Sequence, residues 1–263
     1  FALELGTSLF VLLFSRCLIG LFLLTPVLIL KKKSLLIPRT LIFPFILLSL
    51  VSVSLIASTY HAIEFLNIAL VLIIMYSFPL GIALISHFRG EEKVKFPQWL
   101  CLISILLGLT ISLSDGTLQG NVYGITVSVI SLTLMIIFIY CSNKLVKSIG
   151  SLTFNFNMNF LSLLFLIIAY FLFDLTILIP ESNSGKLALF LNGLFYVLSY
   201  TLFFTGSQYI GISRASVLAI TEPLFASLFA FIFLSQFLTT LEWFGFFVVI
   251  FSLYFYEKYK VSR

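Results

Sequence analysis

Two charged side chains, Arg16 and Glu222, stand inside long apolar segments of this sequence. An ionisable group at membrane depth costs at least about 2.5 kcal/mol and is a functional candidate by default. Glu222 could carry a coupling proton, pair with Arg16, or cap backbone groups that the neighbouring Pro223 leaves free. Arg16 precedes Lys31 by fifteen residues, and three roles stay open for it: binding an anionic solute group, neutralising Glu222, or snorkelling to the outer surface.

Two prolines, Pro79 and Pro223, also fall in the middle of apolar segments. A proline inside a helix removes one backbone hydrogen bond and loosens the carbonyl one turn earlier, here at Met75 and Ala219. In lipid such carbonyls are tolerated only when they are buried in protein or face a wet cavity. The sequence therefore predicts paired helix kinks that shape a solute path, with bending for packing alone as the alternative.

A stripe of polar and aromatic residues has helical spacing, because Asn192, Tyr196 and Tyr200 follow one another at intervals of four. Such residues share one helix face. Together with Tyr76 they are predicted to line a substrate cavity, while anchoring at the membrane interface is the alternative for the tyrosines.

Three asparagines, Asn155, Asn157 and Asn159, come at intervals of two. That spacing points them in different directions on a helix. We expect them to cap the helix and to be solvated at the interface, and not to form one site.

The residues that build metal sites and polar active sites are scarce and scattered. Cys17, Cys101 and Cys141 lie far apart without a metal or disulfide spacing, and neither His61 nor His87 has a second ligand at metal spacing. There is no HExxH motif, no Asp-rich motif and no P-loop. We expect no enzyme activity, no metal and no cofactor.

The elements that must position these residues are membrane helices. The chain has 263 residues, 61% of them hydrophobic and 10% charged, which lies far from the composition of soluble domains. Continuous apolar runs without alternation exclude a membrane barrel. We predict nine transmembrane helices, at residues 8–30, 40–59, 63–86, 97–114, 121–141, 154–174, 187–207, 213–234 and 241–257.

The basic residues predict the orientation, because Lys and Arg collect in cytoplasmic loops. Nearly all of them fall in alternate connections: Lys31, Lys32, Lys33 and Arg39, then Arg89, Lys93 and Lys95, then Lys144 and Lys147, then Arg214, and finally Lys258, Lys260 and Arg263. The opposite side keeps only Lys186. The sequence thus predicts a multi-pass protein of the cell (inner or plasma) membrane with a cytoplasmic C-terminus, and its net charge of +5 does not indicate a nucleic-acid partner.

An internal repeat appears when the sequence is shifted by 144 residues. The shift lays FPLGIALISHF (Phe78–Phe88) on EPLFASLFAFI (Glu222–Ile232), and it also brings Trp99 onto Trp243, the only two tryptophans. The match predicts two units, residues 1–115 and 119–258.

The same shift leaves the helix at 121–141 without a counterpart in this chain. We therefore expect a ten-helix bundle of two five-helix units, of which nine helices are present here. An odd number of helices inverts one unit relative to the other, and secondary transporters with inverted repeats hold their sites near the midplane.

Three segments resemble EamA-type carriers of the drug/metabolite transporter superfamily: Leu13–Pro26 with its Arg, Ala62–Ile85, and Gly211–Ile250 with its Arg-Ala-Ser turn and Glu-Pro pair. The resemblance implies a ten-helix carrier that moves metabolites by alternating access. Family members commonly carry Glu after the fourth and ninth helices. This chain has Gly90-Glu91-Glu92 and Ser235-Gln236 there.

These observations predict a secondary transporter for a small metabolite or drug-like solute, with the lipid bilayer as its surroundings. A proton or sodium as coupling ion is left open, as is a homodimer. A flippase for lipid-linked sugars of related fold is the nearest alternative, and a polytopic membrane enzyme is a more distant one. A channel is disfavoured because the connections are too short for a re-entrant filter loop.

Overall fold

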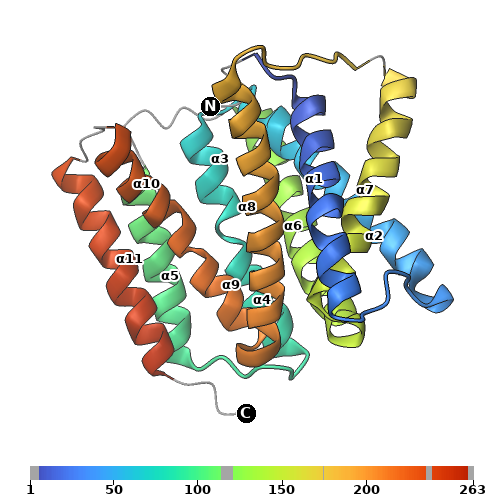
Figure 1. Cartoon of the computed structure of the whole chain (residues 1–263). Coiled ribbons are helices and arrows are strands. Elements are labelled where there is room, and N and C mark those ends of the chain that lie inside the picture. The colour runs from blue at the N-terminus through green and yellow to red at the C-terminus, as the bar shows by residue number, and fades with distance from the viewer. Residues whose placement is uncertain (1–5, 114–120, 174, 235–238, 260–263) are drawn as a thin grey trace. The chain divides into compact units, whose positions relative to one another are not determined.

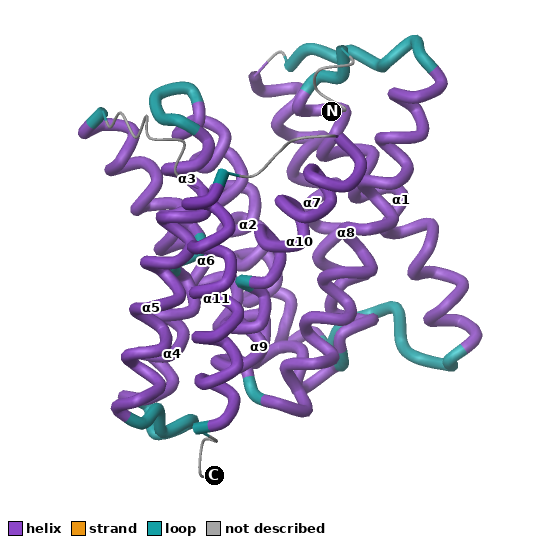
Figure 2. The backbone as a smooth tube through the Cα atoms, turned by 90° about the vertical axis from the view of Figure 1, so that its left-hand side faces the viewer, coloured by secondary structure: helices purple, strands orange, loops and turns teal. Residues whose placement is uncertain are grey.

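The computed structural model describes residues 6–113, 121–173, 175–234 and 239–259, and every regular element within these ranges is a helix (Figure 1, Figure 2). In chain order they are α1 (Leu9–Leu30), the 3-10 helix η1 (Arg39–Leu41), α2 (Ile42–Ile63), α3 (Ile68–Met75), α4 (Phe78–Phe88), α5 (Phe96–Leu113), α6 (Val122–Ile149), α7 (Ser151–Phe173), α8 (Asn183–Ile210), α9 (Ile212–Ala219), α10 (Thr221–Leu234) and α11 (Thr240–Lys258). Nine spans of the described chain are long and apolar enough to cross a membrane. The predicted all-helical membrane fold is confirmed.

Helix α6 is longer than the apolar pattern predicted. It was expected to end at residue 141 and continues to Ile149, past Lys144 and Lys147. Lysine is a good helix former, so the helix extends beyond the apolar run with its basic residues outside the hydrocarbon. Apolar length therefore predicts the membrane-embedded part of a helix better than its end.

Side chains close several helix ends locally. The Ser8 side chain accepts a hydrogen bond from the Val11 N–H at the start of α1. Thr239 and Glu242 form a capping box at the start of α11, in which each side chain accepts from the backbone N–H of the other. These contacts satisfy N–H groups that a helix cannot bond internally.

The 144-residue shift relates helix boundaries as well as sequence. Helices α3 and α9 are both eight residues long, with first residues Ile68 and Ile212 and last residues Met75 and Ala219. Helices α5 and α11 also begin 144 residues apart. The two halves of the sequence thus break and restart their helices at equivalent places, as expected of two repeats.

The described chain forms two compact units, and each draws on both halves of the sequence. Unit 1 comprises Phe1–Val53 and Cys141–Tyr209, and unit 2 comprises Ser54–Tyr140 and Ile210–Arg263. The unit boundaries fall inside α2, inside α6 and at the last residue of α8. These units are defined by contacts in space, whereas the repeats are defined by sequence similarity. The repeat boundaries 1–115 and 119–258 therefore stay a prediction.

In unit 1, helix α1 packs closely against α7 and α8. A Cβ atom added at Gly20 of α1 would lie 2.8 Å from Val197 Cγ2 and 2.9 Å from Asn159 Oδ1. Small residues allow this approach in membranes, where helices associate by packing and not by escape from water. Gly20 lies one turn after Arg16, so the same contact holds Arg16 close to α7 and α8.

In unit 2, α5 and α11 pack along their length, side by side at the left of Figure 1. Their backbones meet at two glycines: a Cβ added at Gly245 would lie 2.6 Å from the Gly108 carbonyl oxygen and 2.5 Å from the Ser112 nitrogen. The buried core around this pair consists of Ala83, Val94, Leu102, Ile105, Leu109, Val217, Ile220, Leu224, Phe246, Val249, Leu253 and Tyr256. This core also holds α9 and the start of α10 in place.

We predict that Gly245→Ala lowers the free energy of unfolding by about 1–3 kcal/mol, because the added methyl group meets backbone atoms that cannot rotate away. Gly206→Ala is the matched control, since a Cβ there meets nothing within 4 Å, and helix propensity favours alanine by up to about 1 kcal/mol. Thermal unfolding of both variants in detergent measures the difference. Equal melting temperatures would contradict the close α5–α11 contact.

Candidate functional site

The third predicted span is discontinuous at Tyr76 and Ser77, between α3 and α4. Pro79 is in the first turn of α4 and has no N–H to donate to the Met75 carbonyl. The Ser77 hydroxyl donates to the Ile74 carbonyl at 2.6 Å. The break thus combines a carbonyl left free by proline with a side chain that satisfies a neighbouring one.

The eighth predicted span has an equivalent break at Ile220, between α9 and α10. Pro223 is the third residue of α10 and leaves the Ala219 carbonyl without its helical donor. The Thr221 hydroxyl donates to the Leu218 carbonyl at 2.8 Å. This bond repeats the bond of Ser77 after 144 residues in both donor and acceptor positions, so the two breaks share one design.

The two broken spans meet within unit 2, where α4 packs against α9. Glu222 is the second residue of α10 and is exposed. Tyr76, from the other break, lies near the carboxylate of Glu222. The structure therefore brings together two candidate residues that are 146 positions apart in the sequence.

The carboxylate of Glu222 lies near half-depth of its span. It follows the start of α9 by ten residues, which is about 15 Å at a helical rise of roughly 1.5 Å per residue. At the first turn of α10 it is next to unbonded N–H groups and the positive end of the helix dipole, which stabilise a negative charge. A carboxylate at this depth is costly in lipid, so its exposed position makes it a candidate for a polar pathway.

In unit 1, Arg16 is in the first half of α1, about 10 Å from its first residue Leu9. The guanidinium carbon lies 4.0 Å from the centroid of the Tyr196 ring, a cation–π contact. Its Nε atom is buried without a hydrogen-bond partner. No described carboxylate of unit 1 forms an ion pair with it, so within these residues the guanidinium keeps an unused donor.

Of the residues predicted to line one cavity, those of α8 lie together, and Tyr76 belongs to the other unit. The rings of Tyr196 and Tyr200 lie 4.8 Å apart, and Asn192 is exposed one turn before them. Tyr76 belongs to unit 2 with Glu222, whereas Arg16, Tyr196 and Tyr200 belong to unit 1. One cavity shared by all of them stays a prediction.

The prediction that the three asparagines cap the helix and are solvated was wrong. Helix α7 begins at Ser151, so Asn155, Asn157 and Asn159 are inside it, and all three are buried. The Asn155 amide donates to the Thr201 hydroxyl at 2.9 Å, and the Oδ1 atom of Asn159 is buried without a partner. Polar atoms inside hydrocarbon need internal partners, and three amides so close together in an apolar segment were a signal of that need.

Glu91 and Glu92, which lie in the connection after α4, accept hydrogen bonds from α6 and α9. The Tyr140 hydroxyl donates to Glu91 at 2.6 Å, and the Ser213 N–H donates to Glu92 at 3.4 Å. Glu92 also contacts Gly211, whose φ of 89° precedes α9. A carboxylate therefore caps the first half of the broken span, while Ser235-Gln236 lie outside the described residues.

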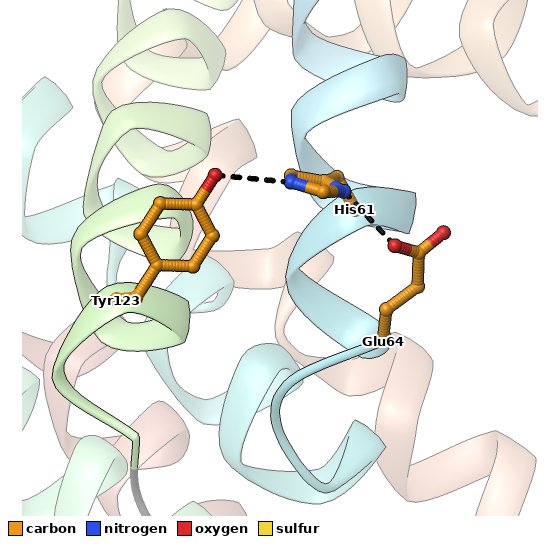
Figure 3. Close-up of polar contacts among 3 residues, drawn as sticks. All are labelled: His61, Glu64 and Tyr123. Carbon is orange, nitrogen blue, oxygen red and sulfur yellow. Dashed lines mark hydrogen bonds and ion pairs between the residues drawn. The ribbon is translucent and has the colours of Figure 1, made fainter.

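A small polar cluster joins α2 to α6 at one end of unit 2 (Figure 3). His61 lies between Glu64 and Tyr123, with its Nδ1 atom 3.0 Å from the carboxylate and its Nε2 atom 3.1 Å from the phenol oxygen. In the described part of the chain, no three His, Cys, Asp or Glu side chains come together as metal ligands. The cluster is a local tether between two helix ends.

Comparisons with known proteins agree with this geometry. The sequence profile of the EamA-like transporter family matches residues 2–114 and residues 122–256. No curated protein matches the chain. A crystal structure of a protein has a TM-score of 0.79 and 15% sequence identity, over 95% of this chain and 89% of that chain. At this identity the likeness shows the fold alone.

We predict that Glu92→Gln lowers the free energy of unfolding by about 1 kcal/mol, because the neutral amide loses the favourable interaction with the α9 dipole. Thermal melting of the purified protein in low and high salt checks this, and the loss should shrink in high salt as screening increases. Glu181→Gln, an exposed carboxylate in a connection, is the control. The same loss in both variants would contradict the capping role.

Proposed function

The chain belongs to the EamA-like transporter family, and from that premise we propose that it is a secondary transporter that moves a small metabolite or drug-like solute by alternating access. It is a multi-pass membrane protein of a transporter family. We further propose that it resides in the cell (inner or plasma) membrane with its C-terminus in the cytoplasm. The alternating distribution of Lys and Arg supports that orientation.

The observation that carries the proposal is the pairing of Tyr76 with Glu222 at the two helix breaks. In secondary transporters, discontinuous helices present half-helix ends to solutes and coupling ions near the midplane. Here both breaks, a phenol and a carboxylate occur together in unit 2. Structural bending alone would not require an ionisable group at this depth.

Glu222 is proposed as the coupling group. Its carboxylate can accept a proton or ligate sodium, and either event removes a net negative charge from the middle of the span. We propose that the Tyr76 hydroxyl donates to the charged form, so that binding of the cation competes with this hydrogen bond. Such competition links occupancy of the ion site to the position of α3 relative to α10, which is the link that coupled transport needs.

Arg16 is proposed to receive an anionic group of the solute. Its unused donor and its stacking on Tyr196 support this role. A guanidinium stacked on a ring can still point its N–H donors at a carboxylate or phosphate. Tyr200 and Asn192 on the same helix extend the polar surface along which such a solute would lie.

We predict that Glu222→Gln and Tyr76→Phe each reduce transport at least about tenfold, since each removes a hydrogen bond to a charged group. The solute followed is the metabolite whose cellular level changes most on expression of the full-length protein. Glu181→Gln and Tyr254→Phe make the same chemical changes at exposed positions and should transport normally. Unchanged transport by both site variants, at equal abundance in the membrane, would contradict the proposal.

For Arg16 we predict that Arg16→Ala raises the half-saturating concentration of an anionic solute about tenfold or more, through loss of a charge-assisted hydrogen bond. Arg16→Lys should recover part of the affinity, because the charge remains while the fork geometry is lost. Concentration dependence of uptake into vesicles measures both variants. Equal half-saturating concentrations for wild type and Arg16→Ala would show that Arg16 does not bind the solute.

A further inference from the structure

A surface groove of about 500 Å³ lies at one end of unit 1, between the connection after α1 and the turn from α6 to α7. Its lining residues are Lys33, Ser34, Leu36, Ile37, Pro38, Ile149 and Thr153. The volume is within the range of small-molecule sites. None of the residues proposed for transport lines the groove, so a ligand bound in it is independent of the proposed solute path.

The groove is built on hydrogen bonds. The Lys33 N–H donates to the Leu28 carbonyl at 3.0 Å, which closes the end of α1. The Thr153 hydroxyl donates to the Ser34 carbonyl at 3.1 Å, and the Asn157 amide donates to the Leu35 carbonyl at 2.9 Å. Helix α7 thus holds the connection in place, and the groove has a defined wall.

The groove carries the positive charge of Lys33 beside the turn from α6 to α7. The Lys33 ammonium lies 3.5 Å from where a Cβ of Gly150 would be, immediately before the first residue of α7. Gly150 also directly follows the last residue of α6, so the negative end of the α6 dipole and the positive end of the α7 dipole meet beside this ammonium. No described carboxylate of unit 1 pairs with Lys33, and the one carboxylate described in this unit, Glu181, follows the opposite end of α7.

Further basic side chains surround this end of unit 1: Lys31, Lys32, Arg39 and Lys147, all exposed. Apolar side chains lie directly beside them, with Leu30 82% and Leu36 81% exposed. Cations next to uncovered apolar side chains are typical of the membrane interface, where headgroups meet acyl chains. The groove therefore offers positive charge on one side and an apolar wall on the other.

We propose that this groove binds the headgroup of an anionic phospholipid. The Lys33 ammonium faces the phosphate, and Leu36, Ile37 and Pro38 contact the glycerol and the first acyl carbons. A free phosphate would satisfy the cations but would leave the apolar wall uncovered. The bound lipid neutralises the Lys33 ammonium and bridges the connection after α1 and the turn from α6 to α7.

The test uses the purified full-length chain in detergent, titrated with phosphatidylglycerol, with phosphatidylcholine of the same acyl chains, or with inorganic phosphate. Phosphatidylglycerol should raise the thermal unfolding midpoint saturably, and the other two should not. Lys33→Gln should weaken the apparent affinity about fivefold, the effect of one lysine near an anionic headgroup. Lys33→Arg should retain it.

Lys31→Gln is the matched control, because it removes the same charge two residues away from a position that does not line the groove. A loss of less than about twofold is expected there, as for a screened surface charge. Equal losses in Lys31→Gln and Lys33→Gln would show diffuse attraction and overturn the site. The same shift from phosphatidylcholine, or from inorganic phosphate alone, would overturn the anionic lipid as its ligand.

Discussion

The structure depends on one constraint: inside hydrocarbon, each backbone N–H and C=O group must find a partner within the protein. Continuous helices meet this requirement, and two membrane spans of the described chain are interrupted, between α3 and α4 and between α9 and α10. Both places carry a proline, and both use a hydroxyl, of Ser77 or Thr221, to bond a neighbouring carbonyl. A relaxed backbone of this kind needs a polar or protein-covered surrounding, so the breaks and the ionisable side chains occur together.

The two deep ionisable groups are supported in different ways. Glu222 is next to the start of a half-helix, whose free N–H groups and dipole favour its charge, and Tyr76 lies near it. Arg16 has an aromatic face beneath it and a donor that no described residue of unit 1 occupies. A supported carboxylate suits reversible exchange of a cation, whereas an unsatisfied guanidinium suits an anionic solute group that arrives and leaves.

The connections contribute more than reversals of direction. Glu92 reaches the start of α9, and a bidentate pair between Arg214 and Glu257 joins α9 to α11. The start of α9 is therefore fixed by these contacts, while its other end leads into the break at Ile220. In unit 1, Thr153 and Asn157 hold the connection after α1 in the same manner. Fixed ends concentrate any change of conformation at the breaks.

The sequence by itself determined the nine spans, the 144-residue repeat, and the positions of Pro79, Pro223, Arg16 and Glu222. These are local properties: apolar length, residue type and the missing N–H of proline. Only the tertiary structure decided that Tyr76 meets Glu222, that Asn155 meets Thr201, and that Glu92 caps α9. Nearly every face of these helices is apolar, so hydrophobic periodicity does not say which faces meet. In lipid, helix partners are chosen by close packing at small residues such as Gly20 and Gly245 and by the need of buried polar atoms for partners, and both require the three-dimensional arrangement.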